Sequence, residues 1–128
     1  MIDLRRFPRC PTRLKAYFPG DEDVYEVVNI SYKGCFVRGK KNISVRKMVF
    51  FEIEIPEIGV IPVYGLVVHH GTEKEPGLGI EILEIERQLL PVWNYYLKAL
   101  LNIEEAKKVY QKYLETAKEL QENSSEKD

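Results

Sequence analysis

The chain has 128 residues, of which 45% are hydrophobic and 30% are charged, a composition typical of a folded domain rather than a disordered chain. No apolar run approaches the roughly 18–20 residues that span a bilayer, and no basic-then-apolar leader follows Met1. We therefore expect no membrane insertion and a cytoplasmic location. The net charge of −1 argues against a general attraction to nucleic acid. Cys10 and Cys35 are too few for a disulfide framework and form no zinc motif, so we expect reduced structural thiols, no metal and no cofactor.

The charge is unevenly distributed along the chain. Residues 1–20 contain five basic side chains and one acid, Asp3. The basic residues are Arg5, Arg6, Arg9, Arg13 and Lys15. This local excess of positive charge is the first functional indication in the sequence.

Six short strands are predicted between Thr12 and Ile85, separated by turn residues. Their approximate ranges are 13–18, 24–29, 35–38, 48–55, 60–70 and 78–83. The clearest alternation lies in the fourth, where hydrophobic and acidic residues occupy alternate positions from Phe51 to Ile55. Because no helical pattern separates the strands, the spacing predicts an antiparallel barrel or sandwich.

A helical pattern begins near Glu86. Pro91 is tolerated in a first helical turn, and the spacing of Asn102 and Glu105 matches a capping box that would start a second helix. The alternative is one long helix, supported by a 4-3 repeat of apolar positions. The repeat comprises Val92, Tyr96, Ala99, Ile103, Ala106, Tyr110, Tyr113, Ala117 and Leu120. We expect a barrel domain over 1–88, a helical extension over 89–122 and a disordered tail over 123–128.

Two interpretations of the helical stripe remain open. From Val92 to Ile103, packing of the stripe on the chain's own barrel and packing on a partner are equally consistent with the sequence. Beyond Ala106 a further ~15 residues add about 22 Å of helix, which is expected to extend past the barrel. The stripe there requires a partner, either a second copy of the chain or another protein.

Arginines spaced as RxxxR lie near the N-terminus. Arg5 and Arg9 form the pair, Arg6 lies between them, and Pro8 disfavours helix at Phe7. An extended segment leaves the arginines free to surround a ligand. A guanidinium group presents a planar fork of donors that matches phosphate oxygens, and its flat face can stack on a nucleobase.

A second motif, NxSxxG, starts twenty residues after Arg9. Asn29 and Ser31 are suited to a turn, because both side chains can bond to nearby backbone N–H groups. We expect Ile30 to point into the core and Gly34 to supply a positive φ where the chain reverses. Asn29 can recognise the hydrogen-bonding edge of a purine, and the Ser31 hydroxyl suits a phosphate.

Together, RxxxR, NxSxxG, six strands and a following helix resemble the PilZ domain family over about residues 3–90. The resemblance includes residues 34–37 (GCFV), 65–68 (GLVV) and 77–81 (GLGIE), which are similar to the family's later strands. It implies a mainly β fold: a six-stranded antiparallel β-barrel followed by a long C-terminal helix or two helices. Asn29 is an allowed variant of the family's Asp/Asn position.

The resemblance also implies a ligand, cyclic di-GMP. Arg5 and Arg9 would hold its phosphates and guanines, with Arg6 as an additional contact. Asn29 and Ser31 would bind guanine and phosphate groups, and Gly34 would shape the turn. Ligand binding would order the N-terminal segment and change a surface that an unidentified partner protein recognises.

The sequence offers three alternative functions. The first is a PilZ-like adaptor or oligomerisation module with weak or no nucleotide binding, in which the helix makes the contacts. The second, RNA or single-stranded DNA binding, is disfavoured because basic and aromatic residues are not interleaved on one sheet face. The third, an enzyme, is disfavoured because adjacent His69 and His70 face opposite sides of a strand and no nucleophile has a base beside it.

Overall fold

The computed structural model describes residues 9–125, with side chains described through Glu122. It contains six strands, a short 3₁₀ helix, Arg87–Leu89 (η2), and one α-helix, Leu90–Ser125 (α1). The strands are β1 (Cys10–Tyr17), β2 (Val24–Ile30), β3 (Gly34–Arg38), β4 (Met48–Ile55), β5 (Gly59–His70) and β6 (Gly77–Ile85). All six predicted strands are therefore present, each within a few residues of its expected bounds.

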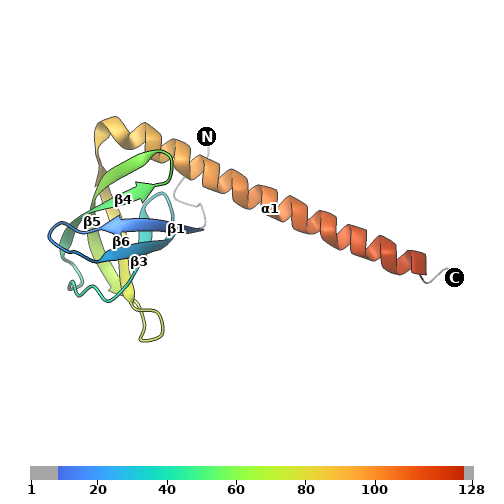
Figure 1. The fold of residues 1–128 in the computed structure, drawn as a ribbon, viewed down its shortest axis with the longest axis horizontal. Helices are drawn as coiled ribbons and strands as arrows, with labels where there is room; N and C mark the ends of the chain where they lie inside the picture. Colours follow the sequence, from blue (N-terminus) through green and yellow to red (C-terminus); the bar gives the residue numbers. More distant parts are fainter. Residues whose placement is uncertain (1–8, 126–128) are drawn as a thin grey trace. The chain divides into compact units, whose positions relative to one another are not determined.

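The strands form a closed antiparallel barrel in the order β1-β2-β3-β6-β5-β4 (Figure 1). Pairing of β1 with β4, for example Ala16 with Ile53, closes the sheet. Closure leaves neither strand as an edge that could pair with another chain. The predicted six-stranded barrel is confirmed, and the sandwich alternative is excluded.

Alternating side chains build the barrel core. On β4, Phe51, Ile53 and Ile55 are buried, whereas Glu52 and Glu54 between them stay partly exposed. Full burial of each such side chain contributes about 1.5–3 kcal/mol. The period-two pattern in the sequence thus defines which face of the strand meets the core.

The first two turns of α1 belong to the same compact unit as the barrel. Contacts divide the chain into residues 1–97 and 98–128. Within the first unit, Trp93 and Leu97 are buried, at 1% and 5% exposure. The start of the helix is therefore buried within the chain's own barrel unit, at least as far as Leu97.

The second unit consists of the rest of α1. The helix is continuous through Asn102, so one helix is present and the capping-box alternative is wrong. It includes residues 123–125, which the sequence assigned to the tail, while residues 126–128 lie outside the described part. Between residues 9 and 125, no helix combines the length and apolar character needed to cross a bilayer.

Candidate functional site

Strand pairing brings Arg9 to Asn29. β1 and β2 are antiparallel, and Cys10 lies opposite Ile30, while Pro11 lies opposite Asn29. Arg9, directly before β1, donates a hydrogen bond from Nη1 to Oδ1 of Asn29 over 2.9 Å. The last residue of the first motif and the first residue of the second therefore meet at one end of the barrel, although twenty residues separate them.

The 31–34 turn is held by its own hydrogen bonds. The Ser31 N–H donates to the Gly34 carbonyl over 2.8 Å, and the Gly34 N–H donates to the Ser31 Oγ over 3.1 Å. A further bond, from the Ile82 N–H to the Lys33 carbonyl over 2.7 Å, ties the turn to β6. Asn29 and Ser31 are partly exposed and Ile30 is fully buried, as the alternation predicts.

Gly34 has a different role from the one expected. Its φ is not positive, so the prediction that it supplies a left-handed conformation is wrong. It is the first residue of β3, opposite Glu81, and it leaves room for close neighbours. A Cβ at this position would lie 3.2 Å from the Ile80 carbonyl oxygen and 3.4 Å from Nη2 of Arg9. Glycine is therefore suited to this position mainly because the Ile80 carbonyl lies so close, and the Arg9 guanidinium lies at contact distance from the same point.

Four of the six predicted site residues are thereby close together: Arg9, Asn29, Ser31 and Gly34. Arg5 and Arg6 lie outside the described residues. Beneath the site, Cys35 is fully buried, and burial raises the pKa of its thiol to about 12, against a smaller opposing effect of the Arg9 charge. The thiol stays protonated and unreactive at neutral pH.

A small cavity of about 190 Å³ borders the same turn within the first unit. Tyr32 and Lys33 line one side, and residues from the end of β6 and the start of α1, including Trp93, line the other. Among the described side chains, Trp93 Nε1 and Asn94 Oδ1 are the buried polar atoms without a hydrogen-bond partner. The cavity connects the turn to the buried beginning of α1.

The opposite end of the barrel holds a hydrogen-bonded cluster that the sequence did not indicate. Asp21 accepts hydrogen bonds from Lys41 Nζ and from the Tyr25 hydroxyl, each over 2.7 Å. The bonds from Lys41 and Tyr25, with one from the Asp23 N–H, lower the pKa of Asp21 to about 2. Asp21 in turn raises the pKa of Tyr25 to about 12. The cluster could not be inferred from the sequence, because it forms only where strand pairing brings the loop after β1 close to the loop after β3.

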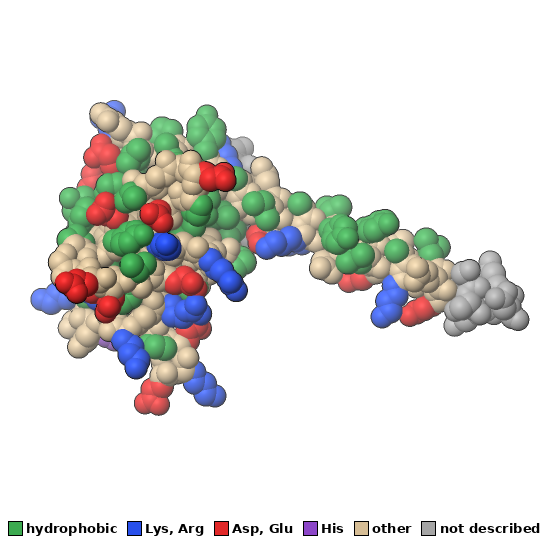
Figure 2. Space-filling model, in the orientation of Figure 1, with side chains coloured by type: hydrophobic (Ala, Val, Ile, Leu, Met, Phe, Trp, Pro, Cys, Tyr) green, Lys and Arg blue, Asp and Glu red, His purple; other side chains and the backbone are tan. Residues whose placement is uncertain are grey.

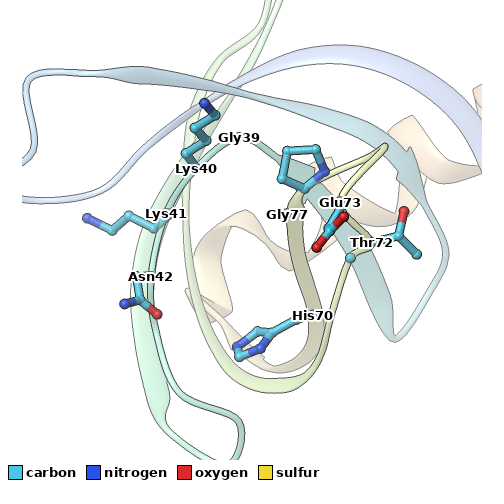
Figure 3. A pocket seen from close by; sticks show the side chains of 10 residues that line it. Gly39, Lys40, Lys41, Asn42, His70, Thr72, Glu73 and Gly77 are labelled. Carbon is cyan, nitrogen blue, oxygen red and sulfur yellow. The ribbon is translucent and has the colours of Figure 1, made fainter.

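A shallow pocket of about 370 Å³ lies at this end, between the loop after β3 and the loop between β5 and β6 (Figure 3). Lys40, Lys41 and Asn42 come from the loop after β3, His70 is the last residue of β5, and Glu73 lies in the loop between β5 and β6. The Lys41 side chain extends away from Glu73 in Figure 3. Because Lys41 is paired to Asp21, the pocket offers less free positive charge than its two lysines suggest.

The two histidines do not form a joint site. His70 Nε2 lies 2.7 Å from the Ile43 carbonyl oxygen, whereas the His69 ring stacks against Phe36 with centroids 6.1 Å apart. Among residues 9–125, no group of three or more His, Cys, Asp or Glu side chains is arranged to hold a metal ion.

Comparison with known protein families identifies the family to which the chain belongs. The family model of the PilZ domain matches residues 3–92, so the chain belongs to the PilZ domain family. This result confirms the resemblance inferred from the two motifs, and it indicates no enzyme family.

Among solved structures, the chain is similar to the Bacillus subtilis inhibitor of motility (MotI/DgrA), with a TM-score of 0.68 and 17% identity. The match covers 83% of this chain and 54% of that one, so the chain corresponds to about half the length of its neighbour. At this identity the likeness shows a shared fold. The search of curated proteins found no match.

Proposed function

We propose that this PilZ domain protein is a cytoplasmic receptor for cyclic di-GMP. The observation that carries the proposal is the Arg9–Asn29 hydrogen bond above the bare backbone of Gly34. Membership of the PilZ family supports the choice of ligand. The proposal requires neither a cofactor nor a catalytic step, and it involves no nucleic acid.

The chemistry of the site suits a dinucleotide with two phosphates. Arg9 is positioned by a neutral amide, so its guanidinium keeps its full charge and its remaining donors for phosphate oxygens or a guanine edge. Asn29 and Ser31 add an amide and a hydroxyl on the same side of the turn. Arg5 and Arg6 would complete the site from the N-terminal segment.

Signalling would follow from ordering of that segment. Closing a chain segment over a ligand costs conformational entropy, which several simultaneous charge-assisted contacts must offset. The ordered segment would present a new surface to a partner protein. The cavity between the turn and the start of α1 offers a second place where ligand binding would alter packing.

Calorimetric titration with cyclic di-GMP tests the proposal, using the wild type, Arg9→Ala and Arg38→Ala. Arg38 is a matched control, because it is also an exposed arginine on the barrel with a side-chain partner, Glu26. Charge-assisted hydrogen bonds contribute about 1.5–3 kcal/mol each, so Arg9→Ala should weaken binding at least ~tenfold. Arg38→Ala should bind like the wild type.

The absence of binding heat in the folded wild type, at tens of micromolar protein, would refute the ligand assignment. Equal losses in both variants would show a nonspecific effect of charge. Thermal unfolding of the unliganded variants provides the folding control, since exposed polar contacts contribute at most about 1 kcal/mol.

The second candidate is an adaptor or oligomerisation module. The exposed apolar side chains of α1 beyond residue 98 favour it, because such side chains commonly contact other proteins. An adaptor without ligand function predicts normal partner binding in Arg9→Ala, whereas a receptor predicts that partner binding depends on cyclic di-GMP.

A further inference from the structure

The second unit of the chain exposes an unusual number of large apolar side chains for a single helix. They are Ile103, Val109, Tyr110, Tyr113, Leu114 and Leu120. Val109 is 70% exposed and Leu120 is 65% exposed. Hydrophobic side chains gather along one side of this part of α1 in Figure 2, and charged side chains lie along another. Apolar patches of this kind mark interaction surfaces.

The stripe has a size symmetry. Its consecutive 4-3 positions are Ile103, Ala106, Tyr110, Tyr113, Ala117 and Leu120. Read in either direction, the order is a large aliphatic residue, alanine, tyrosine, tyrosine, alanine and a large aliphatic residue. A helix with this pattern is complementary to a reversed copy of itself.

We propose that α1 pairs with α1 of a second copy in antiparallel orientation, with a two-fold axis between Tyr110 and Tyr113. This inference rests on the protein-contact role proposed for the helix and identifies its partner. Ile103 then packs against Leu120 of the second copy, Ala106 against its Ala117, and Tyr110 against its Tyr113. A two-fold interface of this kind uses the same patch on both copies, as in most homodimers.

The charges of the helix are compatible with this pairing. From Lys98 to Glu122 there are five lysines and five glutamates, so two copies have no net repulsion. The positions flanking the stripe are Leu100, Asn102, Lys107, Val109, Leu114, Thr116 and Gln121, and Lys107 is the single charge among them. Lys107 is already paired with Glu104 over 2.9 Å. The antiparallel arrangement places Lys107 beside Leu114 of the second copy rather than beside a like charge.

Chain connectivity favours the antiparallel over the parallel pairing. Paired helices have axes about 8–10 Å apart, whereas a domain of ~100 residues has a radius of gyration of about 13 Å. In a parallel pair both barrel units would join their helices at the same end and compete for space. In the antiparallel pair, residue 98 of one copy lies opposite residue 125 of the other, so the two barrel units are attached about 40 Å apart along the helix axis.

Cysteine crosslinking of the full chain tests the pairing. Ile103→Cys and Leu120→Cys chains are mixed and incubated before mild oxidation, and each is also oxidised alone. The antiparallel pair predicts a disulfide-linked dimer in the mixture and none with either variant alone. The wild type serves as the blank because Cys10 and Cys35 are buried, and Lys112→Cys, outside the stripe and its flanking positions, should not crosslink.

Crosslinking of Ile103→Cys with itself would overturn the antiparallel orientation. A wild type that is monomeric by light scattering would overturn self-association altogether, and the stripe would then bind a different protein. Tyr110→Glu should weaken dimerisation at least ~tenfold, because each substitution occurs twice near the axis. Cyclic di-GMP titration of Tyr110→Glu should match the wild type, so failure of the dimer and failure of the ligand site are distinguishable.

Discussion

The two ends of the barrel hold their cations in different ways. At the turn end, Arg9 donates to the neutral amide of Asn29. At the opposite end, Lys41 donates to the carboxylate of Asp21 and lies 5.1 Å from the centre of the Phe18 ring. A carboxylate neutralises its cation, whereas an amide positions a cation and leaves its charge available. The comparison supports the proposal that the turn end binds the anionic ligand, while the ion pair at the loop end stabilises the fold.

After Arg9, Asn29 gives the largest expected effect on ligand binding. In Asn29→Ala, Arg9 loses the group that positions it and the ligand loses an amide contact, so binding should weaken by about tenfold, equivalent to ~1.4 kcal/mol. Asn29→Asp retains an acceptor that positions Arg9 but adds a negative charge beside it, so it should bind less tightly than the wild type by only a few-fold. Calorimetry measures both. Equal loss in Asn29→Asp and Asn29→Ala would contradict a positioning role for this residue.

Lys41 tests the other end. In Lys41→Met the ion pair and the aromatic contacts are lost, so the free energy of unfolding should fall by about 1 kcal/mol, measured by urea denaturation. Affinity for cyclic di-GMP should change less than about twofold, because the charge of Lys41 is already paired with the Asp21 carboxylate. A large loss of binding would instead place the ligand site in the pocket between the loop after β3 and the loop between β5 and β6.

Gly34 tests the close approach between backbone and guanidinium. Gly34→Ala places a methyl group near Nη2 of Arg9, and Gly34→Val adds more bulk. Affinity should fall several-fold in the first variant and further in the second, while stability changes by about 1 kcal/mol or less in Gly34→Ala, since φ is not left-handed. Unchanged affinity in Gly34→Val would show that the spacing above the glycine is irrelevant.

Asp21 should have the smallest effect, which depends on pH. Its folded-state pKa of about 2 lies below the ordinary value of 3.8, so as the pH falls the unfolded chain takes up the proton first. The stabilisation is present above about pH 4 and is lost between about pH 4 and about pH 2. The difference in melting temperature between the wild type and Asp21→Asn should shrink over this range. A constant difference would contradict the ion-pair role.

The barrel could be predicted from the sequence because six short strand-like segments are bounded by turn residues, and the alternation is clear in segments such as Phe51 to Ile55. The meeting of Arg9 and Asn29 could be predicted only through the family resemblance, because it depends on the register between β1 and β2. The function of Gly34 could not be predicted, since it depends on Ile80, a residue 46 positions later on β6. The continuity of α1 at Asn102 was ambiguous, because a capping box in the sequence does not interrupt a helix whose backbone bonds are already satisfied.

Chemical-shift mapping tests the central claim most directly, because it locates the ligand at one end of the barrel or the other. Cyclic di-GMP is added to the ¹⁵N-labelled full chain, and amide shifts are followed. We expect the largest shifts at Arg9 and over residues 29–35, with residues 39–42 and 70–77 nearly unchanged. Shifts centred on those two loops would contradict the assignment of the anion-binding end, and a spectrum without shifts would contradict the receptor function itself.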